Sequence, residues 1–584
     1  MKEVSKMGIV NDYITKVVTR LNEHKYNASK PWLQYYDRMP EHLEYYNGSV
    51  YDMVYDTSLK YPNNTALEYF NSKISYRDFM LHVDAVAVAL KKMDIVENEC
   101  VTICMPNMPE AIYLIYAVNK IGAICNIVHP MLSAGEIEKA MAATNSTSLF
   151  VSDVSYQTVK DLPVENMVVC DVAHSMNVFL RTAYRAKNKK NFNFRDNCVQ
   201  WDAFLKKDNC IMDTHASRSK NSPAVIIYSG GTTGKSKGII LSNLNFNCLA
   251  SQCEAVCKEA RAGNSILSAL PIFHGFGLCV CIHVPLALGL KCILIPKIDT
   301  RKLPQTIKEK KPNLLPVIPS MLNIIVNSKE PGPNAFQSVK VILSGGDYLS
   351  DKLSREVIAY FRRCGSTANI QIGYGLSEAT AFVAATNESV RSIDNLGIPN
   401  PDTDIRVFDP AGENECEYGT VGEICVNGPS VMLGYIDNEE ENAIALRSHR
   451  DGKVWLHTGD LGYMDANGVL HYSSRLKRMI ISNGYNIYPV ELEEVINKCK
   501  YVASSVVVGI RHKIKQEVPK AVIVLKKGVE QTAEIEREIR EYCKKNLARN
   551  AVPQEIEFRT ALPVTKIGKI NYRKLQEDSE QKEV

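Results

Sequence analysis

Residues 228–238 read YSGGTTGKSKG and combine glycines, hydroxyl groups and lysines in one short segment. Glycines allow backbone N–H groups to approach a ligand closely, the hydroxyls can donate hydrogen bonds, and the lysines carry positive charge. A loop of this kind suits the oxygens of a polyphosphate. The apolar run 224–227 directly before it indicates a buried strand, so we expect the loop to leave the end of a strand.

A Walker A loop is one hypothesis for this segment, because that loop requires the pattern G-x-x-x-x-G-K-[ST]. The residues from Gly234 to Ser236 match the final G-K-[ST] of this pattern, but Ser229 stands where the pattern has its first glycine. A helix follows a Walker A loop, whereas no helix-forming run follows Lys237. A P-loop phosphohydrolase is therefore a remote alternative, and a plain flexible turn is the other.

Six further motifs follow in order, and each combines small, hydroxyl, acidic or basic residues. They are LPIFHGFG at 270–277, SGGDYLS at 344–350, GYGLSEAT at 373–380, HTGDLGYMD at 457–465, SRLKRMIISNGYNIYP at 474–489 and PVTKIGKI at 563–570. Each motif alone is a weak signal. An ordered set of seven is not expected by chance.

This set resembles the adenylate-forming superfamily of acyl-CoA synthetases, luciferases and amino-acid adenylation domains, over residues 67–575. Within it the chain looks most similar to fatty acyl-CoA ligases. The resemblance implies that ATP activates a carboxylic acid as acyl-AMP, with release of pyrophosphate, and that the acyl group then passes to coenzyme A (CoA). It also implies a large N-terminal α/β body with mostly parallel sheets and a small mobile α+β lid.

The resemblance assigns the nucleotide contacts residue by residue. Asp460 would accept hydrogen bonds from the ribose hydroxyls, with Arg475 nearby, although these two could instead form a plain surface salt bridge. Ser377 stands where most members have threonine. The residues implied to contact the nucleotide are Ser229, Gly230, Thr232, Thr233, Gly234, Lys237, Gly345, Gly346, Asp347, Tyr374, Gly375, Ser377, Asp460 and Arg475.

Activation brings two anions together, the carboxylate and the α-phosphate, so positive charge must stabilise the transition state. The resemblance implies that Lys569 bridges them. It assigns Glu378 to Mg²⁺, for which a carboxylate oxygen is a suitable ligand. His274 would line the mouth of the acid pocket, whereas an isolated histidine beside phenylalanines is more often a core residue.

The thiol step needs a second arrangement of the lid. The resemblance places a hinge at Lys477 and implies that Ser482, Asn483 and Gly484 line the channel for CoA after rotation. Rotation about a few hinge residues is a common form of domain closure. Ser474 replaces a glycine that is usual before the arginine.

The acid pocket is expected from the apolar segments 273–290 and 317–322, which favour a medium- or long-chain fatty acid. Aryl and steroid-like (bile) acids are the alternatives. The family's amino-acid activators carry an aspartate near His274, and this chain has none there. A fatty acyl-AMP ligase that loads a carrier protein and a non-catalytic nucleotide binder are the remaining alternatives.

Composition excludes some classes of protein. The 69 basic and 65 acidic side chains leave a net charge of +4, too small to indicate a nucleic-acid partner. The basic run 185–190 is interpreted as a solvated loop. Seventeen cysteines, scattered through apolar stretches, favour reduced thiols in a cytoplasmic protein. Cys279 and Cys281 lack the spacing of a zinc site.

We expect no signal peptide at the start of this sequence, because its first residues are charged and no apolar block follows. The longest apolar run, residues 277–290, contains His283 and Pro285 and is shorter than the roughly 20 residues that span a bilayer. It is therefore expected to be a buried core segment rather than a transmembrane one. Peripheral contact with a membrane and the oligomeric state stay open.

Short apolar runs alternate with helical patterns, as in α/β domains. We predict strands at 101–105, 123–128, 148–151, 167–169, 224–228, 292–295 and 341–343, and helices over 75–90 and 110–121. Residues 185–222 are polar and indicate a surface insertion or a subdomain boundary. We predict an N-terminal body, 1–474, and a lid, 475–584, with a helix from Pro489. Residues 1–45 show only a helix-like stretch near 9–21.

Overall fold

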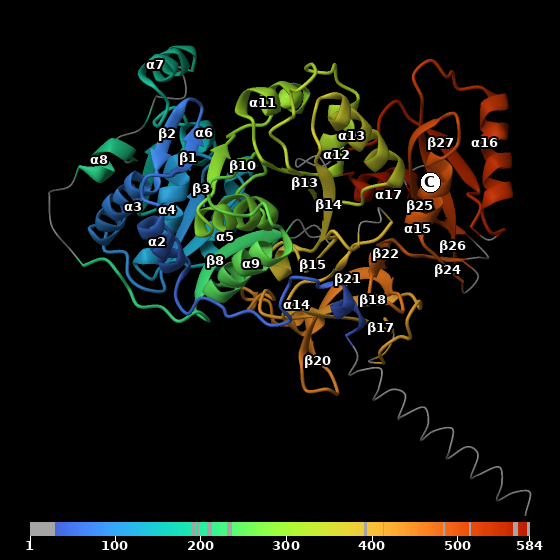
Figure 1. Cartoon of the computed structure of the whole chain (residues 1–584), viewed down its shortest axis with the longest axis horizontal. Helices are drawn as coiled ribbons and strands as arrows, with labels where there is room; N and C mark the ends of the chain where they lie inside the picture. The colour runs from blue at the N-terminus through green and yellow to red at the C-terminus, as the bar shows by residue number, and fades with distance from the viewer. Residues whose placement is uncertain are drawn as a thin grey trace, which may run out of the picture.

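The computed structural model describes residues 30–188, 194, 198–206, 213–229, 236–390, 394–410, 412, 414–482, 485–512, 516–549, 551–564 and 570–580. In these residues the strands form four sheets. The first two make up the body, and the last lies at the opposite end of the molecule in orange and red (Figure 1). The predicted α/β body with a small C-terminal α+β unit is confirmed. The predicted helix near 9–21 lies outside the described residues.

One body sheet has the strand order β19-β9-β8-β4-β3-β5-β6-β7. Its strands from β8 to β7 run parallel, and β9 and β19 add an antiparallel edge. The parallel strands are mostly short buried apolar runs, because both faces of such a sheet are covered. Their bounds are β3 Cys100–Cys104, β4 Ile124–Ile127, β5 Ser148–Ser152, β6 Asn166–Cys170, β7 Val199–Gln200, β8 Pro223–Ser229, β9 Lys237–Ser242 and β19 Gly434–Tyr435.

The other body sheet has the order β16-β15-β14-β13-β12-β10-β11-β1-β2. Its central strands are parallel, so their carboxyl ends meet at one edge. The bounds are β1 Thr65–Tyr69, β2 Ser72–Ser75, β10 Ser265–Ser268, β11 Lys291–Leu294, β12 Leu314–Val317, β13 Val341–Ser344, β14 Asn369–Tyr374, β15 Ala384–Ala385 and β16 Ile398–Pro399.

Helices cover both sheets. The predicted helix start at Ser75 is confirmed, since its side chain accepts a hydrogen bond from the Asp78 N–H. The helices of the body are α2 Val50–Lys60, α3 Tyr76–Lys91, α4 Pro109–Lys120, α5 Ala134–Ala143, α6 Asp153–Val159, α7 Val178–Lys187, α8 Trp201–Leu205, α9 Asn243–Val256, α10 Val284–Ala287, α11 Leu303–Lys310, α12 Pro319–Val326 and α13 Asp351–Arg363, with the π-helix η3 Phe276–His283 and the 3₁₀ turns η1 Pro31–Tyr35, η4 Thr300–Lys302 and η5 Ser377–Ala379.

Helix α7 corrects one prediction. Arg185 and Lys187 lie in its last turn, so the interpretation of the basic run 185–190 as a solvated loop is wrong for these residues. The side chain of Asn177 accepts a hydrogen bond from the Leu180 N–H and starts the helix. Tyr184 and Arg185 then bond to acidic residues of the body, which holds the helix in place.

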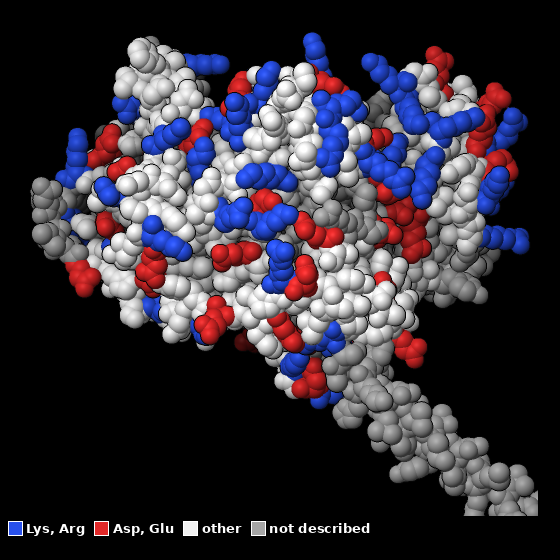
Figure 2. All heavy atoms as spheres, in the orientation of Figure 1, with Lys and Arg blue, Asp and Glu red and all other residues white. Residues whose placement is uncertain are grey.

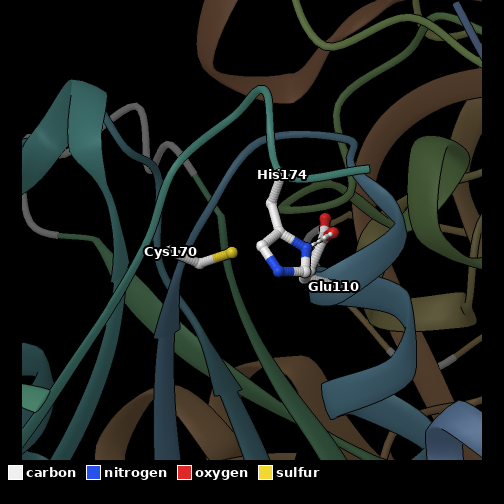
Figure 3. Close-up of side chains that lie close together, drawn as sticks. All are labelled: Glu110, Cys170 and His174. Carbon is white, nitrogen blue, oxygen red and sulfur yellow. Dashed lines mark hydrogen bonds and ion pairs between the residues drawn. The ribbon is translucent and has the colours of Figure 1, made fainter. Parts of the chain in front are cut away.

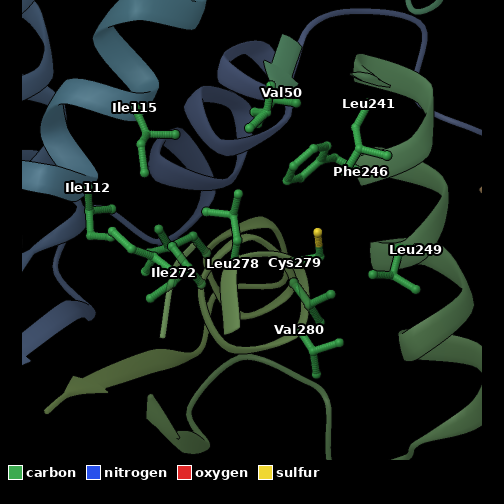
Figure 4. Packing of buried hydrophobic residues seen from close by; sticks show 14 of the residues in the cluster. Val50, Ile112, Ile115, Leu241, Phe246, Leu249, Ile272, Leu278, Cys279 and Val280 are labelled. Carbon is green, nitrogen blue, oxygen red and sulfur yellow. The ribbon is translucent and has the colours of Figure 1, made fainter. Parts of the chain in front are cut away.

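The π-helix η3 lies at the centre of the body, where side chains of α2, α4 and α9 surround it (Figure 4). A Cβ on Gly277 would lie 1.9 Å from the carbonyl oxygen of Pro271, so only glycine fits there. Burial lowers the pKa of His283 to about 3, so this ring is neutral. The predicted buried core segment is confirmed. None of the helices in the described ranges is long and apolar enough to cross a membrane.

A third sheet links the body to the C-terminal unit. It comprises β17 Asp404–Phe408, β18 Gly422–Asn427, β20 Leu446–Ser448, β21 Val454–Met464 and β22 Leu470–Arg475, with helix α14 Glu439–Ala445 beside it. The 3₁₀ turn η6 Leu476–Arg478 follows β22 and leads into the last sheet. The predicted boundary between residues 474 and 475 falls at this turn and stays a prediction.

The fourth sheet is formed by residues beyond 479 and contains β23 Ile480–Ser482, β24 Tyr485–Ile487, β25 Val502–His512, β26 Gln516–Leu525 and β27 Glu555–Phe558. Helices α15 Pro489–Asn497, α16 Ala533–Asn546 and α17 Tyr572–Glu580 accompany it. As predicted, Pro489 opens a helix, where proline is favoured because the first N–H groups of a helix have no partner within it.

Acidic and basic side chains are interspersed over the face that Figure 2 shows. The sixteen cysteines that the structure describes form no disulfide bond with one another, and most of them are buried. Burial raises the pKa of thiols such as Cys104, to about 12, so these groups are packing residues rather than nucleophiles.

Glu110, Cys170 and His174 lie together where the loop after β6 meets the start of α4 (Figure 3). The His174 ring nitrogens face two carboxylates, with Nδ1 2.7 Å from Glu110 and Nε2 2.9 Å from Asp202. Burial by itself lowers the pKa of His174, but the two carboxylates raise it to about 9. We therefore interpret the group as a buried ion pair that ties the loop to the helix.

This ion pair predicts a pH-dependent stability. The pKa of His174 is about 9 in the folded protein and about 6.5 when unfolded, so its contribution is complete below pH 6.5 and is lost as the pH rises through 9. His174→Gln should therefore flatten the fall in unfolding free energy between pH 6.5 and 9.5, measured by urea denaturation, by up to roughly 1.4 kcal/mol per pH unit. His215→Gln, at an exposed pair, is the control, and equal slopes for His174→Gln and the wild type would contradict the assignment.

Candidate active site

The glycine-rich segment joins two antiparallel strands. Ser229 at the end of β8 pairs with Lys237 at the start of β9, and the Ser236 hydroxyl donates to the Ser229 carbonyl at 3.0 Å. Gly230, Thr232, Thr233 and Gly234 lie outside the described residues. A Walker A loop leads into a helix, whereas this one leads into a strand. The hypothesis of a P-loop phosphohydrolase is therefore wrong.

Lys237 belongs to a polar chain that leads to Glu378. Its ammonium group lies 2.6 Å from Glu441 Oε2 and 4.9 Å from the centre of the Tyr435 ring. The Tyr435 hydroxyl donates to Glu378 Oε1 at 3.0 Å. Sheet pairing between β9 and β19 positions Tyr435, and helix α14 carries Glu441. Lys237 thus lies over the ring of Tyr435, and Glu378 accepts a hydrogen bond from the hydroxyl of the same tyrosine.

His274, Gly345, Gly346, Gly375 and Ser377 line one cavity of about 200 Å³. The glycines follow directly on β13 and β14, whose carboxyl ends meet at this edge of the sheet. A Cβ on Gly375 would lie 1.9 Å from the Ala381 carbonyl oxygen, so only glycine fits at this position. Asp347 comes next after Gly346 and is exposed to solvent.

The remaining wall of this cavity is mostly apolar. Phe276, Gly277, Val280 and Val284 of the segment 273–290 contribute to it, as the sequence predicts, and Ile318 contributes from the segment 317–322. Sequence reasoning missed the part of the wall that comes from the end of α9 and from the sheet. These residues are Cys253, Val256, Cys257, Ala260, Ile266 and Leu314.

Asp460 and Arg475 face each other across the pair β21 and β22, with Nε of Arg475 2.8 Å from Asp460 Oδ1. The charge of the buried Asp460 raises the pKa of Arg475, so the guanidinium stays ionised. The Tyr374 hydroxyl donates to Asp460 Oδ2 at 2.9 Å. Burial and the charge of Asp460 raise the pKa of Tyr374, which keeps this hydroxyl a donor.

A second polar group, which sequence reasoning missed, lies behind residues 458–460. Glu423 accepts a hydrogen bond from the Gly459 N–H at 3.0 Å, and its other oxygen lies 2.8 Å from His457 Nδ1. His457 Nε2 lies 2.9 Å from His449 Nε2. Glu423 thereby holds the backbone next to Asp460. Tyr435 and Glu441 were missed as well, because no local pattern marks residues that meet only through sheet pairing.

The hinge and channel predictions fall at the start of the C-terminal unit. Lys477 is exposed in the turn η6, Ser474 is buried in β22, and Ser482 is buried at the end of β23. Asn483, Gly484 and Lys569 lie outside the described residues. The bridge between Val564 and Ile570 brackets the segment that carries Lys569.

A hydrogen bond connects the C-terminal unit to the body near Asp347. The Tyr348 hydroxyl donates to Glu494 of α15. Within the C-terminal unit, the Arg478 guanidinium lies 3.7 Å from the centre of the Tyr572 ring and 2.6 Å from Glu493. Helix α15 is therefore held close to the loop after β13, and Arg478 ties the turn η6 to α15 and α17.

Residues 55–436 match the family described as AMP-binding enzyme, and residues 491–569 match the AMP-binding enzyme C-terminal domain. The chain belongs to the AMP-binding enzyme family. A long-chain-fatty-acid–CoA ligase of Bacillus subtilis is 30% identical, over 94% of this chain and 98% of its own length. An indoleacetate–CoA ligase of Aromatoleum aromaticum is 28% identical, over 87% and 94% of the two chains.

A solved structure of the anthranilate CoA ligase AuaEII, in complex with anthranoyl-AMP, superposes with a TM-score of 0.78 over 92% of this chain and 98% of that one, at 21% identity. This likeness shows the fold alone. Family and relatives together confirm the prediction of an enzyme, an AMP-forming acid–thiol ligase that uses ATP and CoA.

The group behind residues 458–460 predicts a selective effect on nucleotide affinity. Glu423→Gln keeps the shape of the side chain but turns one acceptor oxygen into a donor, which must face either the Gly459 N–H or His457. We expect the KM for ATP to rise about tenfold, as for the loss of one charge-assisted hydrogen bond, with a smaller change in kcat. Glu417→Gln, at an exposed position, is the control. An unchanged KM for ATP in folded Glu423→Gln would refute this role.

Proposed function

We propose that this enzyme activates a medium- or long-chain fatty acid as acyl-AMP and transfers the acyl group to CoA. One observation carries the proposal: the predicted nucleotide residues Gly345, Gly346, Gly375 and Ser377 share a cavity with an apolar wall. An acid whose chain lies along that wall presents its carboxylate at the polar end. His274 lines this cavity as well and is proposed to orient the carboxylate at its mouth.

In the first step, a carboxylate oxygen attacks the α-phosphorus of ATP, and the bond to the pyrophosphate oxygen breaks. Asp460 and Arg475 are proposed to hold the ribose side of the nucleotide, because the two side chains lie within 2.8 Å of each other and the Tyr374 hydroxyl fixes the Asp460 carboxylate. Gly345, Gly346, Asp347 and the Tyr374 ring are proposed to enclose the adenine. Lys569 is proposed to neutralise the two reacting anions.

The phosphates are proposed to lie against the loop that contains Ser229, Gly230, Thr232, Thr233 and Gly234. Lys237 follows this loop. Its ammonium group, which pairs with Glu441 in this structure, is proposed to bind phosphate oxygens when the nucleotide is present.

Mg²⁺ fits the residues at Glu378. This partly exposed carboxylate accepts one hydrogen bond from Tyr435, and a single carboxylate combined with substrate phosphates is a usual environment for Mg²⁺. When bound, the ion would neutralise charge on the pyrophosphate. Ser377, beside Glu378, offers a hydroxyl at the same end of the cavity.

In the second step, the CoA sulfur attacks the acyl carbon, AMP leaves with the former carboxylate oxygen, and the thiol proton passes to solvent. We propose that the lid, residues 475–584, rotates about Lys477 and brings Ser482, Asn483 and Gly484 to the channel. The bond between Tyr348 and Glu494 must break in such a rotation, and the short exposed turn η6 is a suitable hinge. Ser474 is buried in β22 and lies just outside that turn.

An aryl acid is the second candidate substrate, because relatives include an indoleacetate–CoA ligase. Pyrophosphate release from a panel of acids of different chain length and ring content will separate the two. A comparison of thioester formation on CoA with thioester formation on a carrier protein will show which of the two accepts the acyl group. Pyrophosphate release that needs no carboxylic acid would overturn the proposal as a whole.

The cavity wall predicts which variant changes chain length. Val280 lies in η3 and lines the cavity, so Val280→Phe should fill part of the space that a long chain needs. We expect kcat/KM for hexadecanoic acid to fall at least about tenfold, while octanoic acid loses much less. Octanoic acid is the internal control for folding. Equal losses for both acids, or none for either, would contradict a linear chain along this wall.

The assignment of Lys569 predicts a separation of the two steps. Lys569→Ala should slow adenylation, measured by pyrophosphate exchange, by about 10²–10³-fold, because a charge that faces the transition state is lost. Transfer to CoA from chemically prepared acyl-AMP should remain within about threefold of the wild type, since Lys569 faces the first step only. Lys574→Ala, at an exposed lysine of α17, is the matched control. An equal loss of rate in adenylation and in transfer would contradict the assignment of Lys569 to adenylation alone.

A further inference from the structure

Helix α7 presents its apolar side chains to solvent. None of its residues is buried, and the exposed fractions are 65% for Val178, 88% for Phe179 and 37% for Leu180. Within the described residues, these are the only three consecutive positions among the exposed large hydrophobic side chains. Ala183 and Ala186 are exposed as well and lie four and seven positions after Phe179, on the same helix face.

The opposite face of α7 is the one that contacts the body. The Tyr184 hydroxyl donates to Asp153 at 2.8 Å, and Arg185 Nε donates to Asp171 at 2.9 Å. A surface helix normally turns its apolar stripe inward and its polar face to water. In α7 the apolar side chains face the solvent and polar side chains face the body. The hydrogen bonds of Tyr184 and Arg185 hold the helix in this orientation.

The helix also projects from the molecule. It lies at the upper left of Figure 1, beyond the sheet and the helices that cover it. At the same place Figure 2 shows a knob of uncharged atoms with lysine or arginine atoms at its sides. An exposed apolar tip of this kind marks a surface for contact rather than part of a core.

The charge around α7 indicates the chemistry of the contact. Residues 172–195 contain no aspartate or glutamate, but they contain the six basic residues Arg181, Arg185, Lys187, Lys189, Lys190 and Arg195. Three of these basic residues, Arg181, Arg185 and Lys187, belong to α7 itself. A short helix with an exposed phenylalanine and basic residues of its own suits the boundary between acyl chains and anionic headgroups. Arg185 already pairs with Asp171 of the body, whereas a neutral partner surface would make use of the phenylalanine but not of Lys187, which is exposed in the last turn of α7.

We propose that α7 docks this enzyme on the surface of an anionic lipid bilayer, with Phe179 and its neighbours in the headgroup region and basic residues on the lipid phosphates. The contact is peripheral and reversible, because one short helix buries little apolar surface. It lies outside the proposed active site and does not rest on the proposed function. A bilayer is also the phase into which long-chain acids partition, so docking would bring the enzyme to them.

Cosedimentation of the full chain with vesicles tests the proposal without any substrate. We expect binding to vesicles of phosphatidylcholine with about one third phosphatidylglycerol, weakening at high salt, and little binding to phosphatidylcholine alone. Phe179→Ser should weaken binding about tenfold or more. Leu81→Ser, on α3 and 62% exposed, is the matched control and should bind as the wild type does. Lys187→Glu should weaken binding and reduce its salt dependence.

Two results would overturn the proposal. One is equal vesicle binding by the wild type, Phe179→Ser and Lys187→Glu. The other is self-association of the wild type that Phe179→Ser abolishes, without vesicle binding by either, since the apolar face would then bind a second copy. Unchanged thermal melting and unchanged adenylation of a short-chain acid in these variants show that they are folded. Because α7 carries no residue of the active site, a failure of vesicle binding leaves the proposed chemistry untouched.

Discussion

The body depends on the burial of η3, an apolar helix with two different sides. On one side Leu278 and Cys279 pack among side chains of α2, α4 and α9 (Figure 4). On the other side Phe276 and Val280 line the cavity. The wide turns of a π-helix are costly unless packing holds them, and they occur mainly where function requires them. Here the packing of the core side holds the helix, and with it this wall of the cavity, in place.

The polar end of the same cavity follows from the parallel sheet. Strands β10, β12, β13 and β14 are parallel neighbours, and the chain leaves each of them at the same edge. The segment with His274 follows β10, Gly345 follows β13 and Gly375 follows β14. Ligands of open α/β sheets bind beyond the carboxyl ends of the strands. One edge of one sheet therefore collects motifs that lie far apart in the sequence.

Much of this arrangement could be predicted from the sequence. Buried parallel strands are short apolar runs, so β3, β5 and β13 could be located to within about two residues, and the capping residue Ser75 marks the start of α3. The glycines and charged residues of the candidate site could be predicted as well, because they lie within short sequence motifs. Glu423, Tyr435 and Glu441 could not be found, because each reaches the site through pairing or packing with a distant segment. The reversed amphipathic order of α7 was hidden too, since a helical pattern does not say which face meets the body.

The site lies where three sheets meet, and two tyrosine hydroxyls make polar contacts between them. Tyr374 joins the sheet of β14 to β21 through Asp460, and Tyr435 joins the edge of the other body sheet to Glu378. Both tyrosines donate to a carboxylate, and burial together with that carboxylate raises the pKa of each. A buried donor without its acceptor is costly, so the two carboxylates are held in place whether or not a ligand is bound. The lid, by contrast, follows a short exposed turn after Arg475 and is held by contacts such as that of Tyr348 with Glu494. In the proposed mechanism, carboxylates held in place in the body would let one nucleotide site serve both arrangements of the lid, because the lid follows a short turn that can act as a hinge.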